Sequence, residues 1–571
     1  MTPRPRVALV FVPQGEPAMP HLALPMLKAY LQAQLGVSAD LFDLNLIFYR
    51  QLLSRDGVTS LTRLLEGHGL LTRGRTLRSH LARLAEDISV ALALLDGRAW
   101  DPARYAWALD RVADACGLFG LAHPGYDLSL KNLSLPGWNA SSGALLGWVE
   151  NPGNPFIPFF EPHVERLARY DVVGLSLTWT GQLVPVFVLA RLLKHRAPGL
   201  RIVLGGSLVP HLLDGLLGAE ELMRDIDFLV PFEGERPLVE IVTSMREGRD
   251  PGMVGGVFSF EARTRKPRVP SLDSIPLTAD AIQTPDFTGL KIEEYLSPQT
   301  CLPVIASRGC YYGQCTFCDH FHHLTAHHVR PVSKVLDELQ ALRARHGVKH
   351  FFFVDDCLPV ATLRDLSEKL KDNPEGGIRF MAEIRPEATL TRHLLERAAS
   401  AGCHALLFGL ESGSQETLDR MHKGTNLQVA QRVLAQAHAA GILTWCFFMV
   451  GYPGESLDEV SATFRLLEEQ RRDIDVIAGG PFVMTRYAPL AEDGAMPGLS
   501  IDRVCPDLCL TRGWHHPKSP TSEALDRVLA KAEDVLGEVY PRLASFVEVH
   551  MFAFRQEDYQ DRLVRTGALD E

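Results

Sequence analysis

The sequence lacks several features that would each mark a class of protein. It has no apolar run of about 18 residues, which predicts no membrane-spanning helix, and its first apolar run is too short for a secretion signal. Lysine and arginine total 58 against 69 aspartate and glutamate residues, so the net charge of −11 offers no basic surface for nucleic acid. Ten cysteines in 571 residues are too few for a disulfide scaffold. We expect a cytoplasmic protein with neither nucleic-acid nor membrane partners.

Short-period repeats and low-complexity tracts are also absent, and the first part of the chain instead alternates apolar runs with helical patterns. Continuous apolar strands separated by helices are typical of a parallel sheet that is covered on both faces. The pattern therefore predicts an α/β, doubly wound, Rossmann-like domain at residues 1–260. Residues 50–160 read as a helical insertion, which either packs on the sheet or covers a substrate.

The same alternation returns after a proline-rich linker at residues 261–300. Six strand–helix units at residues 301–490 predict a partial (βα)6 TIM-like barrel, and residues 491–571 predict a helical C-terminal region. In such a barrel the catalytic groups lie at the carboxyl ends of the strands. The strand ends of this segment are therefore the places to search for a site.

Three cysteines follow the first barrel strand, in the stretch SRGCYYGQCTFCDH at residues 307–320. Their spacing is C-x4-C-x2-C, and three thiolates on one loop can hold an iron–sulfur cluster with one iron left open. Zinc is the main alternative, because a structural zinc site takes four protein ligands and nearby histidines could supply the fourth. A thioredoxin-type pair is disfavoured by the third cysteine. The cysteines are Cys310, Cys315 and Cys318, and the histidines are His320, His322, His323, His327 and His328.

This arrangement resembles the radical S-adenosylmethionine (radical SAM) superfamily, whose hallmark is C-x3-C-x2-C after the first barrel strand. Phe317 stands at the position of the aromatic residue that usually precedes the last cysteine, although the first gap here is four residues long. The flanking SRG and Asp319 resemble the branch that carries an N-terminal cobalamin domain. The resemblance implies that the three cysteines hold a [4Fe–4S] cluster whose open iron binds SAM. It also implies a 5′-deoxyadenosyl radical that a water-excluding barrel protects.

The resemblance further implies that later strand ends contact SAM and the substrate. A guanidinium suits a bidentate grip on the SAM carboxylate, and a glycine lets the backbone approach the adenine without a Cβ. The alternatives are helix capping for the aspartates, a surface ion pair for the third strand, and a core or rim position for the last pair. In strand order the candidates are Asp355 and Asp356, Glu383 and Arg385, Glu411 and Ser412, Gly451, and finally Arg486 with Tyr487 facing the substrate.

The N-terminal domain resembles the cobalamin-binding domains of class B radical SAM enzymes. A doubly wound domain binds ligands at the carboxyl ends of its strands. The D-x-H-x-x-G motif that ligates cobalt in many cobalamin proteins is missing, and His21 is interpreted either as loop packing or as a residue beneath the corrin. The candidate contacts at the strand ends are Ser176, Thr178, Thr180, Gly205, Gly206, Ser207, Glu233 and Gly234.

The first hypothesis is a cobalamin-dependent radical SAM methyltransferase acting on an unactivated carbon of a peptide or small natural-product precursor. Its electrons would come from a donor such as flavodoxin or ferredoxin. A second hypothesis is a cobalamin-dependent radical SAM enzyme that catalyses rearrangement or cyclisation, and a third is a non-catalytic zinc- or cobalamin-binding regulatory protein. Methylthio transfer is disfavoured because no second three-cysteine domain is present, and the other seven cysteines are interpreted as mostly structural.

Overall fold

The computed structural model describes residues 5–70, 75–260, 267–268, 277–319, 327–371, 377–537, 547–556 and 558. The chain divides into two compact units, each built from more than one segment. The first comprises Met1–Ala93, Asp110–Leu296 and Cys505–Leu510, and the second comprises Leu94–Leu109, Ser297–Val504 and Thr511–Glu571. In the part of the chain that the structure describes, no helix combines the length and the apolar character needed to cross a membrane.

The first unit contains a seven-stranded sheet in the order β2-β1-β5-β6-β7-β8-β9. Five strands are parallel, and the last two add as antiparallel strands at one edge. The strand order reverses beside β1, which creates a switch point between β1 and β5 at the carboxyl edge. The strands are β1 Val7–Phe11, β2 Ala39–Asp43, β5 Val172–Ser176, β6 Arg201–Gly205, β7 Phe228–Val230, β8 Phe258–Phe260 and β9 Pro267–Arg268.

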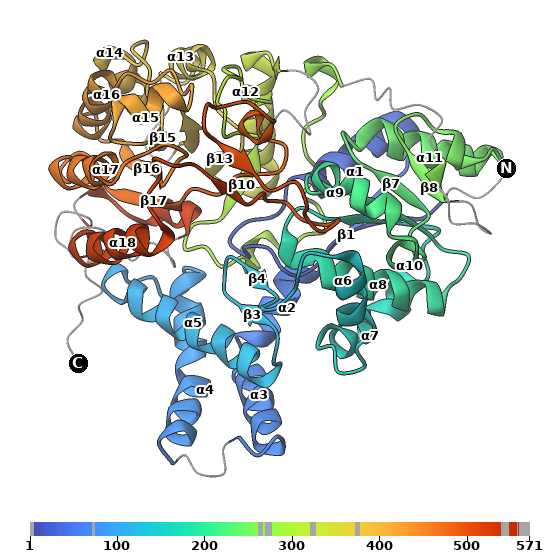
Figure 1. The fold of residues 1–571 in the computed structure, drawn as a ribbon. Helices are drawn as coiled ribbons and strands as arrows, with labels where there is room; N and C mark the ends of the chain where they lie inside the picture. The colour runs from blue at the N-terminus through green and yellow to red at the C-terminus, as the bar shows by residue number, and fades with distance from the viewer. Residues whose placement is uncertain are drawn as a thin grey trace. The chain divides into compact units, whose positions relative to one another are not determined.

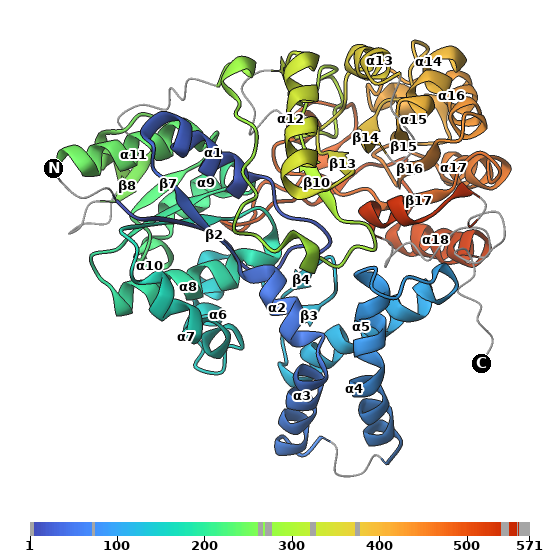
Figure 2. The same ribbon diagram turned by 180° about the vertical axis from the view of Figure 1, so that it is seen from behind.

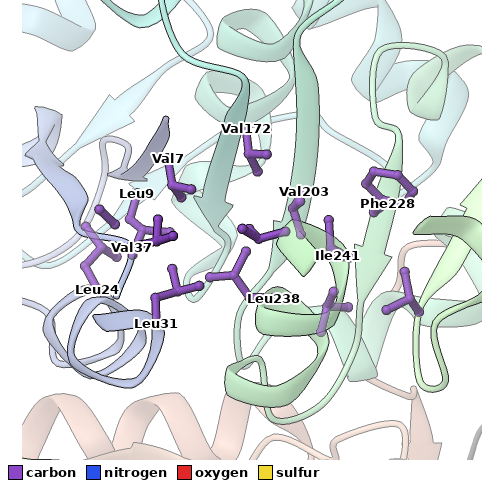
Figure 3. Packing of buried hydrophobic residues seen from close by; sticks show 14 of the residues in the cluster. Val7, Leu9, Leu24, Leu31, Val37, Val172, Val203, Phe228, Leu238 and Ile241 are labelled. Atoms are coloured by element: carbon purple, nitrogen blue, oxygen red, sulfur yellow. The ribbon is translucent and has the colours of Figure 1, made fainter. Parts of the chain in front are cut away.

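Helices cover both faces of this sheet, which confirms the predicted doubly wound architecture. On one face, α1 (Ala23–Leu35) and α11 (Glu235–Glu247) pack apolar side chains against the strands, as Figure 3 shows. Leu31 and Ile241 are fully buried in this cluster with Val172. The remaining helices include α8 Leu183–Arg196, which is buried along most of its length, α9 Val209–Gly218 and α10 Glu220–Met223.

The region expected to be a helical insertion is helical for most of its length. Helices α3 and α4 run side by side in both views of the ribbon (Figures 1 and 2). A short antiparallel pair, β3 with β4, interrupts the helices and was not predicted. The elements are α2 Leu44–Leu52, α3 Arg55–Gly67, α4 Arg75–Leu95, α5 Tyr105–Ala122, β3 Asp127–Leu128, β4 Leu133–Ser134, α6 Ser142–Glu150 and α7 Phe156–Leu167.

The second unit contains a six-stranded parallel sheet whose strands follow chain order, with a helical crossover after each strand except the last. This confirms the predicted partial (βα)6 barrel. The strands are β10 Cys301–Val304, β13 His350–Phe353, β14 Arg379–Ile384, β15 Cys403–Glu411, β16 Leu443–Val450 and β17 Val476–Pro481. The intervening helices are α12 Val332–His346, α13 Val360–Lys369, α14 Arg392–Ser400, α15 Gln415–Arg420, α16 Leu427–Ala439 and α17 Leu457–Glu469.

Local sequence explains where several of these helices begin. Thr391, Asn426 and Ser456 each accept a hydrogen bond from a backbone N–H in the first turn of the helix that follows. Such side chains satisfy donors that have no partner inside the helix. Ser456 forms a capping box with Glu459, whose carboxylate bonds back to the Ser456 N–H. The starts of these helices are thereby fixed.

The C-terminal region is only partly helical. It begins with a short antiparallel pair, β18 (Ser500–Ile501) with β19 (Trp514–His515), where the sequence analysis expected helix. Helix α18 (Ser522–Gly537) and the 3-10 helix η8 (Glu548–Ala553) follow. Another short pair, β11 (Ser307–Arg308) with β12 (His328–Val329), frames the cysteine loop.

Each unit also includes a segment that is remote in sequence. In the first unit, the Asp507 carboxylate accepts hydrogen bonds from both the backbone N–H, at 2.9 Å, and the hydroxyl of Ser142. In the second unit, the Tyr105 hydroxyl lies 2.9 Å from Nδ1 of His550.

Candidate active site

The start of the cysteine loop is held by hydrogen bonds to one buried carboxylate. Strand β10 pairs with β13 from Cys301 opposite His350 to Val304 opposite Phe353, so the segments beyond both strands leave the sheet together. The Asp355 carboxylate accepts hydrogen bonds from the backbone N–H groups of Ala306 and Ser307 and from the Ser307 hydroxyl. Burial outweighs these bonds and raises the pKa of Asp355 to about 6. Asp355, predicted to contact a cofactor, is thus engaged in holding the loop that carries the cysteines.

The three cysteines differ in their surroundings. Cys315 is buried, whereas Cys310 and Cys318 are half-buried. A hydrogen bond from the Cys357 thiol, helped by the backbone N–H groups of Gly313 and Tyr312, lowers the pKa of Cys310 to about 5. Burial raises the pKa of Cys315, against the opposing effect of nearby cations. The loop therefore offers one readily ionised thiol beside two others.

Within the described ranges, no three His, Cys, Asp or Glu side chains converge on one point as ligands of a single ion would. A [4Fe–4S] cluster does not require that convergence, because each thiolate binds a different iron. Of the histidines considered as a fourth zinc ligand, His327 and His328 are described, while His320, His322 and His323 lie outside the described residues.

Two buried cations lie beside the cysteine loop. The Arg385 guanidinium stacks on the Tyr312 ring at 3.6 Å and donates a hydrogen bond to the carbonyl oxygen of Lys423. The Lys423 ammonium donates to Oε1 of Glu411 at 2.7 Å. Burial opposes the charge on Lys423, but Glu411 and Cys315 outweigh it, so its pKa is raised. Two positive charges are thus fixed where thiolates would gather negative charge.

Lys423 was not among the predicted site residues, although it lies within the quoted motif FGLESGSQETLDRMHKG. The only sequence feature that marks Lys423 is the glycine that follows it, Gly424, which has a positive φ of 66°. A Cβ at Gly424 would lie 2.2 Å from the Tyr312 hydroxyl, so the chain needs glycine there. That hydroxyl donates to the carbonyl of His422 at 2.8 Å, which ties the cysteine loop to this turn.

The fourth strand ends in an unusual backbone conformation. Glu411 is buried and has a φ of 68°, a region that non-glycine residues seldom occupy and that is common at functional sites. Ser412, predicted beside it as a cofactor contact, is fully buried, and its hydroxyl lies 3.3 Å from the Thr463 hydroxyl and accepts from the Ser414 N–H. The Ser412 hydroxyl thus supports the turn, and the cofactor contacts predicted for Ser412 and Glu411 stay predictions.

Phe317 packs into an apolar cluster at the ends of the later strands. Met421, Tyr452, Phe482 and Met484 form the buried part of this cluster. Thr316 precedes Phe317, and its hydroxyl lies 2.7 Å from the Tyr452 hydroxyl. The second half of the cysteine loop is thus anchored to the fifth strand end, at the turn that contains Gly451.

The Gly451 turn is held by a glutamate that the sequence analysis did not identify. Gly451 has a φ of 81°, and Oε2 of Glu455 accepts hydrogen bonds from the N–H groups of Gly451 at 2.6 Å and Tyr452 at 3.1 Å. Burial raises the pKa of Glu455 to about 7. Its other oxygen, Oε1, is buried and has no hydrogen-bond partner among the described residues. A buried acceptor in this state is suited to meet a donor from a ligand.

Further carboxylates lie at the other strand ends. Desolvation, followed by the carboxylates of Glu548, Asp356 and Glu411, raises the pKa of Glu383 to about 8. Glu383 therefore holds a proton at neutral pH. Beyond the sixth strand, the Arg486 guanidinium lies 5.3 Å from the Tyr487 ring centroid, and both residues are half-buried.

The carboxyl edge of the sheet in the first unit brings together several of the residues predicted there. The Thr178 hydroxyl lies 3.4 Å from the Ser176 hydroxyl and 3.4 Å from Nε2 of His21. The His21 ring stacks on Phe11 with centroids 4.5 Å apart, and burial lowers its pKa to about 4. Nδ1 of His21 is buried and has no hydrogen-bond partner among the described residues. A neutral imidazole thus stands at the switch point with one nitrogen unsatisfied.

Two amide side chains that the sequence analysis missed brace these loops. Gln182 accepts hydrogen bonds from the N–H groups of Thr178 and Trp179 and donates to the carbonyl of Val12. Asn45 bonds both the N–H and the carbonyl of Gly15, each at 2.9 Å. Such contacts join segments far apart in the chain, so no local pattern signals them.

The other predicted residues of this edge have mixed surroundings. Gly206 has a φ of 118°, and a Cβ there would lie 2.3 Å from the carbonyl oxygen of Leu177, so this glycine is required by the fold itself. Ser207 is exposed. The Glu233 carboxylate accepts a hydrogen bond from the N–H of Leu277 at 2.6 Å. Thr180 begins a 3-10 turn, while Gly205 and Gly234 are half-buried.

Comparison with known proteins finds a family domain within the second unit. The family model described as the Radical SAM superfamily matches residues 304–467, from the end of β10 into α17. The chain therefore carries a radical SAM domain at these residues. The solved structures that share its fold include the radical SAM methyltransferase TsrM of Kitasatospora setae, with cobalamin and a [4Fe–4S] cluster bound, and the cobalamin-dependent enzyme OxsB.

The likeness to TsrM covers 99% of each chain at 14% identity with a TM-score of 0.61. The likeness to OxsB covers 82% of this chain and 52% of that chain at 17% identity with a TM-score of 0.51. An uncharacterized methyltransferase from Pyrococcus horikoshii is 27% identical over 386 residues, which are 63% of this chain and 77% of that protein.

Two other relatives are matched over a smaller share of their length. Cytidylyl-2-hydroxyethylphosphonate methyltransferase from Streptomyces wedmorensis is 29% identical over 265 residues, 43% of this chain and 46% of that protein. An anaerobic magnesium-protoporphyrin IX monomethyl ester cyclase from Rubrivivax gelatinosus is 25% identical over 300 residues, 49% of this chain and 51% of that protein. The match therefore spans about half of each of these enzymes.

Proposed function

We propose that the protein is a cobalamin-dependent radical SAM methyltransferase that acts on an unactivated carbon. The observation that carries the proposal is the cysteine loop at the end of β10, clasped at its start by Asp355 and flanked by the buried cations Arg385 and Lys423. Methyltransferases among the relatives and the cobalamin-bound TsrM, which shares the fold, support the same reading.

The residues of the second unit fit an iron–sulfur cluster with SAM. Cys310, Cys315 and Cys318 would hold three irons, and the two fixed cations would offset the negative charge of thiolates and sulfide. The unpartnered Oε1 of Glu455 at the Gly451 turn would accept a hydrogen bond from the nucleoside part of SAM. Glu411, already paired with Lys423, and Glu383 are the carboxyl groups that would bind the SAM amino group.

The residues of the first unit fit cobalamin. The switch point of an open α/β sheet is where such folds bind ligands. There the Ser176 and Thr178 hydroxyls and the unsatisfied Nδ1 of His21 would bond the polar side chains of the corrin. Gly205, Gly206 and Ser207 form the neighbouring strand end, and Glu233 with Gly234 follows on the next.

When bound, the cluster, SAM and cobalamin would supply an electron, a radical source and a methyl carrier. The chain itself would bind and orient the cofactors and the substrate, and it would exclude water from them. Arg385 and Lys423 hold the cysteine loop and its charge balance, and Glu383 keeps a proton inside the barrel at neutral pH. Arg486 and Tyr487 would face the substrate at the sixth strand end.

The substrate we propose is a peptide or a small natural-product precursor. TsrM has been solved with tryptophan as substrate, and one relative acts on a cytidylyl phosphonate, so small polar metabolites are in range. The electron would come from a flavodoxin or ferredoxin. A second candidate function, cyclisation or rearrangement, is favoured by the cyclase among the relatives.

The proposal is tested by anaerobic reconstitution with iron, sulfide and hydroxocobalamin. We expect about four irons per chain, as one cubane cluster requires, together with bound corrin in the visible spectrum and a loss of iron in Cys310→Ala, Cys315→Ala and Cys318→Ala. A colourless, iron-free protein would contradict both enzymatic readings. Product mass then separates methyl transfer, which adds one methylene unit, from cyclisation, which does not.

A further inference from the structure

A pocket of about 620 Å³ lies at the amino end of the barrel, within the second unit. Three of its lining residues, His350, Arg379 and Leu443, are the first residues of β13, β14 and β16. His404, near the start of β15, also lines it, and Glu411 lies seven positions farther along that strand. At about 3.3 Å per residue, roughly 20 Å separate the pocket from the candidate active site. The pocket is therefore a separate feature of the barrel, and its volume is typical of a small-molecule site.

An irregularity in the barrel sheet positions one of the polar side chains of this pocket. Consecutive residues of β14, Phe380 and Met381, pair with Cys403 and Ala405 of β15. His404 is therefore the extra residue of a β-bulge. Bulges change the direction of a side chain and are over-represented beside functional sites. The bulge is thus the feature of the sheet that brings the His404 ring to the pocket.

The C-terminal segment supplies another side of the pocket, with lining residues that run from Phe552 to Gln556. The Phe552 ring stacks on the His404 ring with centroids 5.3 Å apart, and Nε2 of His404 donates a hydrogen bond to the Met551 carbonyl at 2.7 Å. The Gln556 amide donates to a carbonyl oxygen in the last turn of α16 at 2.8 Å. The segment is thus fixed to the barrel on both sides of Arg555, which also lines the pocket.

The pocket carries positive charge without negative charge. Its described lining residues include two arginines and two histidines, and none of them is acidic. Arg379 and Arg555 are exposed, and neither guanidinium pairs with a carboxylate of the described residues. Burial lowers the pKa of His350 to about 4 and also lowers the pKa of His404, and the charge of Arg379 acts in the same direction on both. The imidazoles are therefore neutral at pH 7, and a ligand would meet the charges of the two guanidinium groups.

We propose that this pocket binds phosphate, either as the free ion or as the phosphate group of a small organic molecule. A guanidinium stays charged at all relevant pH values and donates two parallel hydrogen bonds to phosphate oxygens. Two guanidinium groups match a group that carries between one and two negative charges at neutral pH. The volume of the pocket leaves room for the organic part of an ester. The inference does not depend on the proposed function, because no residue of the pocket belongs to the candidate active site.

The test measures binding by calorimetry on the full-length protein in a phosphate-free buffer. The probes are inorganic phosphate, glycerol 3-phosphate and acetate, and the proteins are the wild type, Arg379→Gln, Arg555→Gln and the double variant. We expect both phosphates to bind the wild type. Each single substitution should weaken this binding, and the double variant should weaken it by at least about tenfold, because charge-assisted hydrogen bonds are the strong ones. Both arginines are exposed, so the unfolding midpoints without phosphate should equal that of the wild type.

Arg465→Gln is the matched control, because Arg465 is an exposed arginine on α17, which supplies none of the described residues that line the pocket. Its affinity for phosphate should equal that of the wild type. Tighter binding of glycerol 3-phosphate would identify an ester as the ligand, and tighter binding of inorganic phosphate would identify the free ion; either result supports the site. Equal affinity in the wild type and the double variant would overturn the inference. So would a wild type that binds neither phosphate, or one that binds acetate as tightly.

Discussion

The ammonium of Lys423 donates a hydrogen bond to the carboxylate of Glu411 over 2.7 Å, and both groups are about nine-tenths buried. Glu411 adopts a left-handed backbone conformation at the end of β15, where the sheet register shifts. The ion pair thus lies where the fourth strand of the barrel turns toward the cysteine loop. Loss of the Lys423 ammonium would leave Glu411, whose backbone is strained, with a buried charge that has no partner from Lys423.

We therefore expect Lys423→Met to destabilise the barrel strongly. Removing one partner of a buried ion pair costs about 3–5 kcal/mol, because the remaining charge stays desolvated. Thermal unfolding of the protein without cofactors should show a clearly lower midpoint. Lys371→Met, which breaks an exposed pair with Glu368, is the control and should leave the midpoint nearly unchanged. Equal midpoints for Lys423→Met and the wild type would contradict this role.

The raised pKa of Glu383 predicts a pH dependence of stability. Between pH 4.5, near the pKa of the unfolded chain, and pH 8, the folded pKa, the folded state holds a proton on Glu383 that the unfolded chain has released. The contribution of Glu383 to the free energy of unfolding is therefore greatest at low pH and falls as the pH rises toward 8. In Glu383→Gln we expect a smaller drop in unfolding midpoint between pH 5.5 and pH 8.5 than in the wild type.

A matched substitution at the surface, Glu396→Gln, should keep the wild-type difference between the two pH values, because Glu396 is exposed and its ion pair with Arg392 is exposed as well. If Glu383→Gln also kept the full difference, another buried acid would be responsible. Glu455, with a pKa of about 7, would be the next residue to substitute.

The unsatisfied Nδ1 of His21 predicts a role in holding cobalamin without ligating cobalt. His21→Phe should keep the stacking on Phe11 and lose one hydrogen bond to the corrin, worth about 1 kcal/mol, so retention of cobalamin should weaken about fivefold. The EPR spectrum of bound cob(II)alamin should be the same in both proteins. His195→Phe, at an exposed position on α8, serves as the control. A change in the cobalt spectrum would place His21 beneath the corrin instead.

Substitution of Glu455 is expected to weaken SAM binding. Glu455→Ala removes the acceptor for the N–H groups of Gly451 and Tyr452 and frees a turn that has a positive φ. We expect the affinity for SAM, measured by anaerobic calorimetry on the reconstituted protein, to fall at least tenfold, because a buried hydrogen bond to a charged group contributes about 1.5–3 kcal/mol. Iron content should not change, and full affinity in this variant would contradict the assignment.

The sequence was informative where a feature is local. Strand–helix alternation predicted both sheets, and the spacing of Cys310, Cys315 and Cys318 predicted a three-thiol loop after the first barrel strand. Glycines that need a positive φ, such as Gly451, are also visible locally. These features depend on neighbours in the chain, which is the information that a pattern carries.

Features that depend on long-range contacts were missed. The contact between the Ser412 hydroxyl and Thr463 of α17 joins residues 51 positions apart. Gln182 and Asn45 act through hydrogen bonds to Val12 and Gly15 of another strand end. Which way a side chain turns at a strand end is decided by packing that the pattern does not record.

The exchange of segments between the two compact units limits how the protein can be dissected. A fragment that stops at Leu296 loses Asp507 and with it the bonds to Ser142. A fragment that starts at Ser297 loses Tyr105, the partner of His550. Neither unit corresponds to one uninterrupted stretch of coding sequence. Work on the separate halves requires a circular permutation or co-expression of complementary pieces, since a simple truncation removes part of each fold.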